Sequence, residues 1–405
     1  MRLFLTFLFL SLAIHAQESG PKILKALPVE ADPVEQQPTT PAAPTAPAVP
    51  ETPAAPVAPP TKPVAPPETP KKPETPTPPP KPPEEKPQQA SHIDQKPTGD
   101  DATRLQIFLD QSNFGPGVID GKIGLFSQLA VKSWNEVNGH PLDDWKAVNT
   151  IARKKITTPY AVALVPEIAN EWVNPKLSQK RSEQAKTKRM AYRSVAEFMS
   201  ERYHTDIPTL IALNPGVNIY GLKPKASITV PNVTPFLVED LTDRAWKELE
   251  DLSDRYVVVD TKMNQVRIFA AAPRPAIIAD PNAPPAPVAN TALLASFPIT
   301  PGKPQFVKFG SWKLKNMVAL PWWRYDQQLL DTGKRSENAL MIPPGPNSPV
   351  GIIWCGTTRA GIGMHGTSDP ETIGRSRSAG CIRLCNWDAI RLPNLIRPGA
   401  TVEIR

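Results

Sequence analysis

The sequence predicts a multidomain α+β protein whose largest folded part is a mostly β domain at the C-terminal end of the 405 residues. Three observations carry this prediction. Proline is concentrated near the N-terminus, apolar residues recur at helical spacing in two short central regions, and from residue 255 they recur at alternate positions. The expected parts are residues 1–16, 17–98, 99–145, 146–189, 190–233 and 255–405.

Residues 1–16, MRLFLTFLFLSLAIHA, are typical of a secretory signal peptide. Arg2 supplies the positive charge, and an apolar run of about 12 residues follows, which is short for a bilayer span. Cleavage after Ala16 is expected. An uncleaved N-terminal anchor, the only membrane contact expected, is the alternative. Either way the sequence predicts export to the periplasm or cell envelope.

Residues 17–98 are predicted to be a disordered, proline-rich linker. Of the 52 prolines in the chain, 20 fall within residues 41–90, a stretch without any aromatic residue. Such a segment cannot bury enough apolar surface to offset its conformational entropy, and we expect an extended tether. Recruitment of a PxxP-binding partner is the alternative.

The net charge of +7 comes from basic residues scattered along the chain. An exported chain meets no nucleic acid, so no nucleic-acid partner is expected, and an anionic polymer such as a cell wall suits the charge better. The densest basic run, RSEQAKTKR (181–189), is interpreted as a solvated part of the connector 146–189.

Residues 99–145 carry two helix patterns separated by a glycine-rich turn. Leu105, Phe108 and Leu109 share one helix face, and Gly139 ends the second helix. The string LQIFLDQSNFGPGVIDGKIGLFSQLAVKSWNEVNG resembles a peptidoglycan-binding domain, with Ser127 in place of the usual threonine. A generic helical hairpin is the alternative.

Residues 190–233 predict a second small module. Ser194 and Glu197 form a capping box before one helix, PTLIALN forms another, and ASITVP forms a strand. This order resembles a LysM carbohydrate-binding module, but the usual opening strand is missing, so a structural spacer is the alternative. His204 is interpreted as a structural histidine.

From residue 255 the period of two predicts strands. YVVVDTKMNQVRIFAA is expected to form a hairpin, and TALLASFPIT, VKFGSWKLK, ALMIPP and TVEIR are expected to form strands. The proline-rich residues 272–290 are predicted to form a long mobile loop. The last helix, 386–396, is expected to begin with Asn386 as its N-cap and to kink at Pro393.

All three cysteines, Cys355, Cys381 and Cys385, lie in the last 51 residues, which is not the distribution of a disulfide scaffold. One reactive thiol, with or without a Cys355–Cys385 bridge, explains them better. A zinc site that also includes His365 is a weaker alternative, because the spacing lacks a second CxxC pair.

A thiol nucleophile needs a base, a group that orients the base, and amides that hold the oxyanion. Cys381 follows Gly380, which permits close approach of a substrate, and His365 is the imidazole nearest to it in the sequence. The Gly366 carbonyl is a candidate to orient His365. Amides at the start of the following helix are expected to lower the thiol pKa.

The strings IPPGPNSPVG (342–351) and IGMHGTSDPETIGRSRSAGCIRLCNWDAIRL (362–392) resemble the L,D-transpeptidase catalytic domain of the YkuD family. The resemblance implies that Cys381 is the nucleophile and His365 the proton acceptor and donor. It assigns supporting places to Gly366, Ser378, Gly380, Arg383 and Asn386. Ala379 stands where the family usually has a second histidine, which implies altered acceptor handling, a slower rate, or an inactive enzyme.

The resemblance implies a cysteine-dependent acyltransferase that builds or remodels peptidoglycan, and hence acts in cell-wall biogenesis and cell shape. Its partners are stem peptides and glycan strands, and it needs no metal or other cofactor. The alternatives are an L,D-carboxypeptidase, an enzyme that attaches proteins to the wall, and a non-catalytic peptidoglycan-binding protein.

Overall fold

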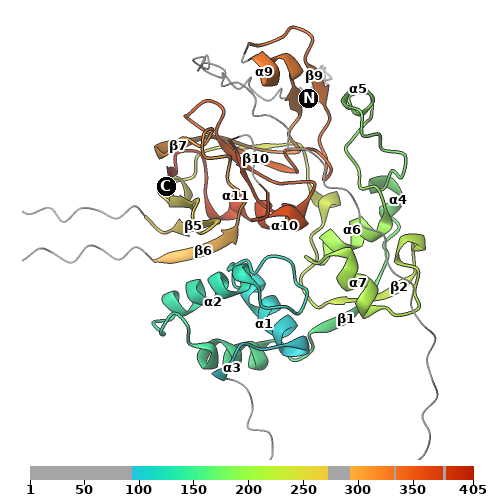
Figure 1. Cartoon of the computed structure of the whole chain (residues 1–405), viewed down its shortest axis with the longest axis vertical. Helices are drawn as coiled ribbons and strands as arrows, with labels where there is room; N and C mark the ends of the chain where they lie inside the picture. Colours follow the sequence, from blue (N-terminus) through green and yellow to red (C-terminus); the bar gives the residue numbers. More distant parts are fainter. Residues whose placement is uncertain (1–93, 272–291, 333, 377–379) are drawn as a thin grey trace, which may run out of the picture. The chain divides into compact units, whose positions relative to one another are not determined.

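The computed structural model describes residues 94–271, 292–332, 334–376 and 380–405 (Figure 1). The predicted signal segment, most of the proline-rich linker and the insert 272–290 lie outside them. The helices are α1 Gly99–Gln111, α2 Leu125–Val137, α3 Trp145–Lys155, α4 Ala169–Trp172, α5 Arg181–Gln184, α6 Val195–Arg202, α7 Ile207–Leu213, α8 Glu250–Ser253, α9 Gln327–Thr332, α10 Asn386–Ala389 and α11 Leu392–Leu395, with 3₁₀ turns η2 Ile219–Gly221, η3 Val238–Asp240 and η4 Pro370–Thr372. The strands are β1 Tyr160–Leu164, β2 Ser227–Pro231, β3 Ala245–Trp246, β4 Tyr256–Asp260, β5 Gln265–Phe269, β6 Leu293–Pro298, β7 Gly310–Ala319, β8 Trp323–Tyr325, β9 Leu340–Ile342, β10 Ile353–Thr357, β11 Gly363–His365, β12 Ile382–Arg383 and β13 Thr401–Ile404.

The N-terminal module contains three helices, α1, α2 and α3, around a shared apolar core (Figure 1). The two predicted helices are present, and Gly139 follows α2 with a positive φ. The third helix was missed because its range was assigned to the connector. Its signal was available, since Asp144 caps it and Val148 and Ala152 are buried at helical spacing.

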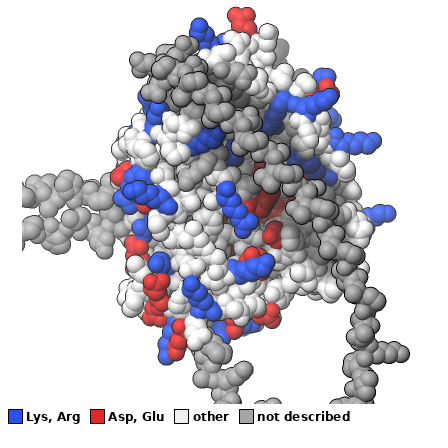
Figure 2. All heavy atoms as spheres, viewed as in Figure 1, with Lys and Arg blue, Asp and Glu red and all other residues white. Residues whose placement is uncertain are grey.

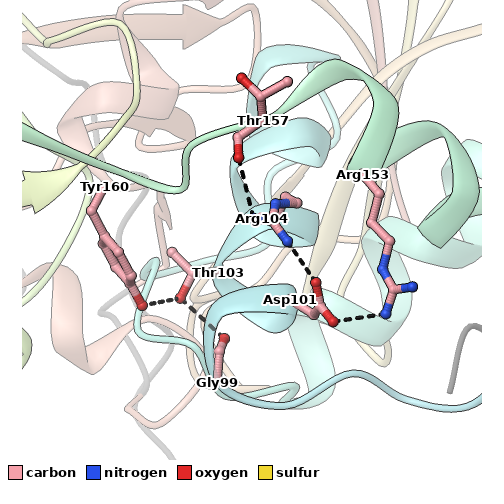
Figure 3. A network of polar contacts seen from close by, with 7 residues as sticks. All are labelled: Gly99, Asp101, Thr103, Arg104, Arg153, Thr157 and Tyr160. Carbon is pink, nitrogen blue, oxygen red and sulfur yellow. Dashed lines mark hydrogen bonds and ion pairs between the residues drawn. The ribbon is translucent and has the colours of Figure 1, made fainter. Parts of the chain in front are cut away.

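A polar network ties the ends of this module together (Figure 3). Asp101 accepts hydrogen bonds from Arg104 and Arg153, both at 2.7 Å, so one carboxylate joins α1 to α3. Thr103, one turn after Gly99, lies 3.1 Å from the hydroxyl of Tyr160 on β1. The network therefore connects the helical module to the strand that follows it.

The second module is a strand–helix–helix–strand unit. β1 pairs antiparallel with β2, and α6 and α7 lie between them in the chain. The opening strand, which the sequence analysis found missing, is present within the predicted connector. Its residues were assigned to the connector, and residues 165–194 separate it from α6. Ser194 caps α6 as predicted, accepting from the Glu197 amide at 3.0 Å, whereas the Glu197 carboxylate accepts from the Arg193 amide.

Nine of the described strands form one sheet, in the order β12-β11-β10-β7-β13-β4-β5-β6 with β3 beside β7. The predicted hairpin is β4–β5, and β6, β7, β9 and β13 match the other predicted strands, although β9 pairs with β8 outside this sheet. The last strand of the chain, β13, lies centrally, parallel to β4 and antiparallel to β7. The predicted last helix is divided into α10 and α11, with Pro393 in the first turn of α11.

A buried cluster of charges joins the helical module to the C-terminal domain. The Asp110 carboxylate lies 2.7 Å from Arg391 and 3.1 Å from His204, whose ring stacks on Trp387. The charges of Arg391 and His204 hold the pKa of Asp110 well below its usual range, although burial opposes them. The prediction that His204 is structural agrees with these contacts.

We expect Arg391→Leu to destabilise the protein by about 3 kcal/mol, because it leaves the buried Asp110 carboxylate without its strongest partner. Chemical denaturation at pH 7 measures the change. Lys225→Gln, which breaks an exposed ion pair with Glu167, is the matched control and should leave the midpoint nearly unchanged. Equal effects of the two substitutions would contradict the prediction.

The loss of stability caused by Arg391→Leu should itself depend on pH. A carboxyl group whose pKa is lowered by folding stabilises the protein above its unfolded pKa, and this contribution is lost as the pH falls toward the folded value. The difference between wild type and Arg391→Leu should therefore shrink below about pH 4.

The surface carries Lys and Arg in small groups with Asp and Glu between them, and the face in Figure 2 shows no continuous basic field. This distribution agrees with the scattered basic residues of the sequence. Within the described residues, no helix is both long and apolar enough to cross a membrane.

Candidate active site

Two short parallel strands at one edge of the large sheet carry the predicted catalytic pair. β11 ends at His365, and β12 begins directly after Cys381. His365 lies opposite Arg383 in the register, so the two side chains share one face of the sheet. Cys381 comes two residues before Arg383, and strand alternation directs it to the same face. The pairing of β11 with β12 thereby places two residues that are sixteen positions apart in the sequence on neighbouring chain segments.

His365 is held by a hydrogen bond and a ring contact. Its Nδ1 donates to the Gly366 carbonyl at 2.6 Å, which is the contact expected from the sequence. Since Nδ1 carries the proton, Nε2 is left with a lone pair that can accept one. The imidazole also stacks on Trp354 of β10, with ring centroids 5.7 Å apart. Gly363 makes room for this indole, because a Cβ there would lie 2.8 Å from it.

The thiol of Cys381 lies beside the loop that leads into β11. Its Sγ is 3.6 Å from the Gly361 carbonyl oxygen. Gly380, which precedes it, has φ of +125°, a conformation that other residues adopt only with strain. A Cβ on Gly302 would lie 2.5 Å from the Gly380 Cα, so the two glycines allow the cysteine loop to pack closely. Trp354, Gly302 and Gly363 were not singled out from the sequence.

Both catalytic candidates are neutral near pH 7. Burial lowers the pKa of His365 to about 4, an effect that the Gly366 hydrogen bond opposes and the positive charge of Arg383 adds to. Burial raises the pKa of Cys381 to about 11, against the opposing effects of the Gly363 amide and of Arg383. The expectation of a lowered thiol pKa was therefore wrong, because desolvation outweighs the nearby positive dipoles. This arrangement suits a general base that takes the thiol proton during attack.

We expect the rate constant kcat/KM to decline on the acid side with an apparent pKa of about 4, because only neutral His365 can accept a proton. Trp354→Leu uncovers the imidazole and should move this limb upward, toward the ordinary histidine value of about 6.5. Initial rates measured from pH 3 to pH 8 test both statements. An acid limb that lies near pH 6.5 in the unmodified protein would contradict them.

Asn386 supports the candidate site by packing against its backbone. Its side-chain amide donates to Glu201 at 2.9 Å, and its oxygen accepts from the Ile352 amide at 3.3 Å. A Cβ on Gly366 would lie 2.0 Å from that oxygen, so Asn386 packs against the backbone that holds His365. Asn386 is the first residue of α10 and Cys385 is the N-cap, so the predicted capping role was wrong. Its side chain instead connects α10 to Glu201 of α6 and to the Ile352 amide.

The remaining predicted residues divide into two groups. Arg383 lies on the same face as His365 and lines a cleft next to it. Ser378 and Ala379 lie outside the described residues.

The other two cysteines are buried thiols that form no disulfide. Burial raises the pKa of both well above the usual range. Across the described residues, no three His, Cys, Asp or Glu side chains gather closely enough to hold a metal ion.

Residues 275–404 match the model of the YkuD family, the L,D-transpeptidase catalytic domain. The YkuD protein of Bacillus licheniformis is 38% identical over 61 residues, which are 15% of this chain and 37% of that protein. The YkuD protein of Bacillus subtilis is 39% identical over 59 residues, which are 15% and 36% of the two chains. The matched segment thus spans little more than a third of the length of these curated relatives.

Solved L,D-transpeptidases give weaker similarities. An enzyme from Mycobacterium smegmatis has a TM-score of 0.26 at 13% identity, covering 38% of this chain and 58% of that one. L,D-transpeptidase 3 from Mycobacterium tuberculosis, in complex with a faropenem-derived adduct, has a TM-score of 0.26 at 16% identity, covering 38% and 60%. The family match confirms the predicted L,D-transpeptidase catalytic domain in this part of the chain.

Proposed function

We propose that this protein is an exported L,D-transpeptidase that cross-links or remodels peptidoglycan through a thioester on Cys381. The observation that carries the proposal is the state of His365. Its Nδ1 proton is held by the Gly366 carbonyl, its Nε2 is therefore a base, and its strand β11 pairs with β12, which begins directly after Cys381. The match of residues 275–404 to the L,D-transpeptidase catalytic domain supports the reaction type.

In the first half-reaction, Sγ of Cys381 attacks the carbonyl carbon of the third residue of a tetrapeptide stem. The thiol proton passes to Nε2 of His365, and a C–S bond forms as the carbonyl becomes an oxyanion. The C–N bond to the terminal D-alanine then breaks. The departing amine takes the proton from His365, which leaves a thioester and a neutral imidazole.

In the second half-reaction, the side-chain amine of a diamino acid on another stem attacks the thioester carbonyl. Its proton passes to His365, the C–S bond breaks, and the sulfur recovers a proton from the imidazolium. The product is a 3→3 cross-link. Because His365 is neutral and the thiol is protonated at pH 7, the proton has to pass to Nε2 as the sulfur attacks.

The two smaller modules fit the same polymer. We propose that the helical module and the strand–helix–helix–strand unit bind the wall, and that the proline-rich linker lets the catalytic domain reach distant stems. Export rests on the apolar segment 1–16.

Incubation of the full chain with purified tetrapeptide stems, followed by mass spectrometry, tests the proposal. Release of D-alanine together with a peptide dimer supports transpeptidation. D-alanine with a tripeptide alone indicates a carboxypeptidase, and transfer to a protein amine indicates an attachment enzyme. Absence of any product, with wall binding that survives Cys381→Ala, indicates a non-catalytic binder and refutes the proposal.

A further inference from the structure

A cleft of about 250 Å³ opens between the connector and the catalytic domain. Three arginines line it: Arg181 from the connector, Arg193 from the start of the second module, and Arg383 from β12. Asp369 is the one acidic residue among the lining residues, so the wall of the cleft carries an excess of positive charge. The sequence analysis interpreted residues 181–189 as solvated, which agrees with the exposed Ser182, Glu183, Lys186 and Lys188 but not with Arg181 and Gln184. Gln184 is buried, and Arg181 lies over the ring of Trp323 with 5.3 Å from its guanidinium carbon to the ring centroid.

The connector is fixed in place along the cleft. The Met190 amide donates to the Pro344 carbonyl at 2.8 Å, and the Asn347 amide donates to the Met190 carbonyl at 2.9 Å. The Asn347 side chain donates to the Ala191 carbonyl at 2.8 Å. A Cβ on Gly345 would lie 2.4 Å from the Met190 carbonyl oxygen, so the two backbones touch. The two arginines of this segment are therefore held by packing rather than presented on a loose chain.

The guanidinium groups have neutral partners. Arg181 donates to Gln184 at 2.7 Å, and Arg193 donates to Asn347 at 3.0 Å. Within the described residues, the buried Nε atoms of Arg193 and Arg383 have no hydrogen-bond partner. Glu197 accepts from the backbone amide of Arg193 but does not line the cleft. A buried guanidinium donor without an anion is costly, and a carboxylate matches its geometry.

Two residues that line the cleft follow the candidate catalytic residues closely in the sequence. Arg383 is two residues beyond Cys381, and Thr367, another lining residue, is two residues beyond His365. Two extended residues span about 7 Å, which is the length of one to two residues of a bound peptide. An anion in the cleft would therefore belong to a group one or two residues from the carbonyl that Cys381 attacks.

We propose that this cleft is a carboxylate subsite that positions an acidic peptide for attack by Cys381, with Arg181 of the connector and Arg193 of the second module as its binding residues. The proposal rests on the proposed function for the identity of the peptide. The carboxylate has two possible sources in a tetrapeptide stem: the terminal group of the departing residue, or a carboxylate carried within the stem.

Binding to a chain that cannot react tests the subsite separately from catalysis. In a Cys381→Ala background, calorimetry at pH 7 measures the Kd of a tetrapeptide stem, of its C-terminal amide, and of a stem whose internal carboxylates are amidated. Arg181→Gln and Arg193→Gln should each weaken binding of the unmodified stem about tenfold, as expected for one charge-assisted hydrogen bond. Lys180→Gln, which removes an exposed charge next to Arg181, is the matched control and should change Kd less than twofold.

The amidated peptides identify the source. If the effect of the arginine substitutions disappears only with the C-terminal amide, the cleft binds the departing residue; if it disappears only with the internal amides, the cleft binds the stem. Arginine substitutions that leave all three Kd values unchanged, or weaken all three equally, overturn the subsite. A chain that turns over stems while these variants bind normally keeps the proposed function and loses this inference. Binding that depends on the arginines, in a chain that does not turn over stems, supports the subsite and contradicts the proposed function.

Discussion

Replacement of Cys381 by serine should abolish peptide turnover, with a fall in kcat of at least about 10³-fold, because a hydroxyl is a far weaker nucleophile for His365 to activate. The substitution is nearly isosteric, and the Gly361 carbonyl can accept from an oxygen as it does from the sulfur. Product release by mass spectrometry measures the rate, and circular dichroism measures the fold. The variant should also form no covalent thioester with a stem peptide.

Cys355→Ala is the matched control for this prediction. It removes a fully buried sulfur from β10, a strand that pairs between β7 and β11. We expect a modest loss of stability from the small cavity and little change in kcat. If Cys355→Ala lowered kcat as far as Cys381→Ser does, the assignment of the nucleophile would be wrong.

Replacement of His365 by glutamine should lower kcat by about 10²- to 10⁴-fold, the usual contribution of a general base. The thiol then has no acceptor for its proton, and its raised pKa of about 11 leaves little thiolate at neutral pH. The residual rate of the variant should therefore increase with pH into the alkaline range, unlike that of the unmodified protein. Rates measured from pH 7 to pH 10 distinguish the two profiles.

His140→Gln provides the control, since His140 stacks on Trp134 in the helical module and is exposed. Its loss should leave the catalytic rate unchanged. A His365→Gln variant that keeps the original rate and a flat alkaline profile would show that the thiol is activated by another group.

Much of the fold was predictable because its signals are local. The alternation in 255–271 predicted β4 and β5, and the spacing of Leu105, Phe108 and Leu109 predicted α1. These patterns depend on neighbours within a turn or a strand, which a single sequence displays directly. The predictions that failed concern elements whose pairing partners are distant in the sequence. β1 was not recognised as an opening strand because its partner, β2, lies more than sixty residues downstream.

The residues of the candidate site show the same division between local and distant signals. Cys381 and His365 were predicted from residue types, adjoining glycines and the family string. Trp354 was not, because an indole on β10 reaches the imidazole only after β10 pairs with β11. Likewise Asn386 was expected to cap a helix, but its side chain donates to Glu201, which lies 185 positions away in the chain.

The sequence by itself determined which residues can carry the chemistry: one thiol after a glycine, one imidazole before another, and a β-rich frame that holds them. The tertiary structure alone decided their protonation states and their surroundings. Burial makes His365 and Cys381 neutral, and the folding of residues 181–193 against the catalytic domain places Arg181 and Arg193 in one cleft with Arg383. The physical reason is that desolvation and charge proximity depend on which chain segments exclude water from a group, and those segments are remote in sequence.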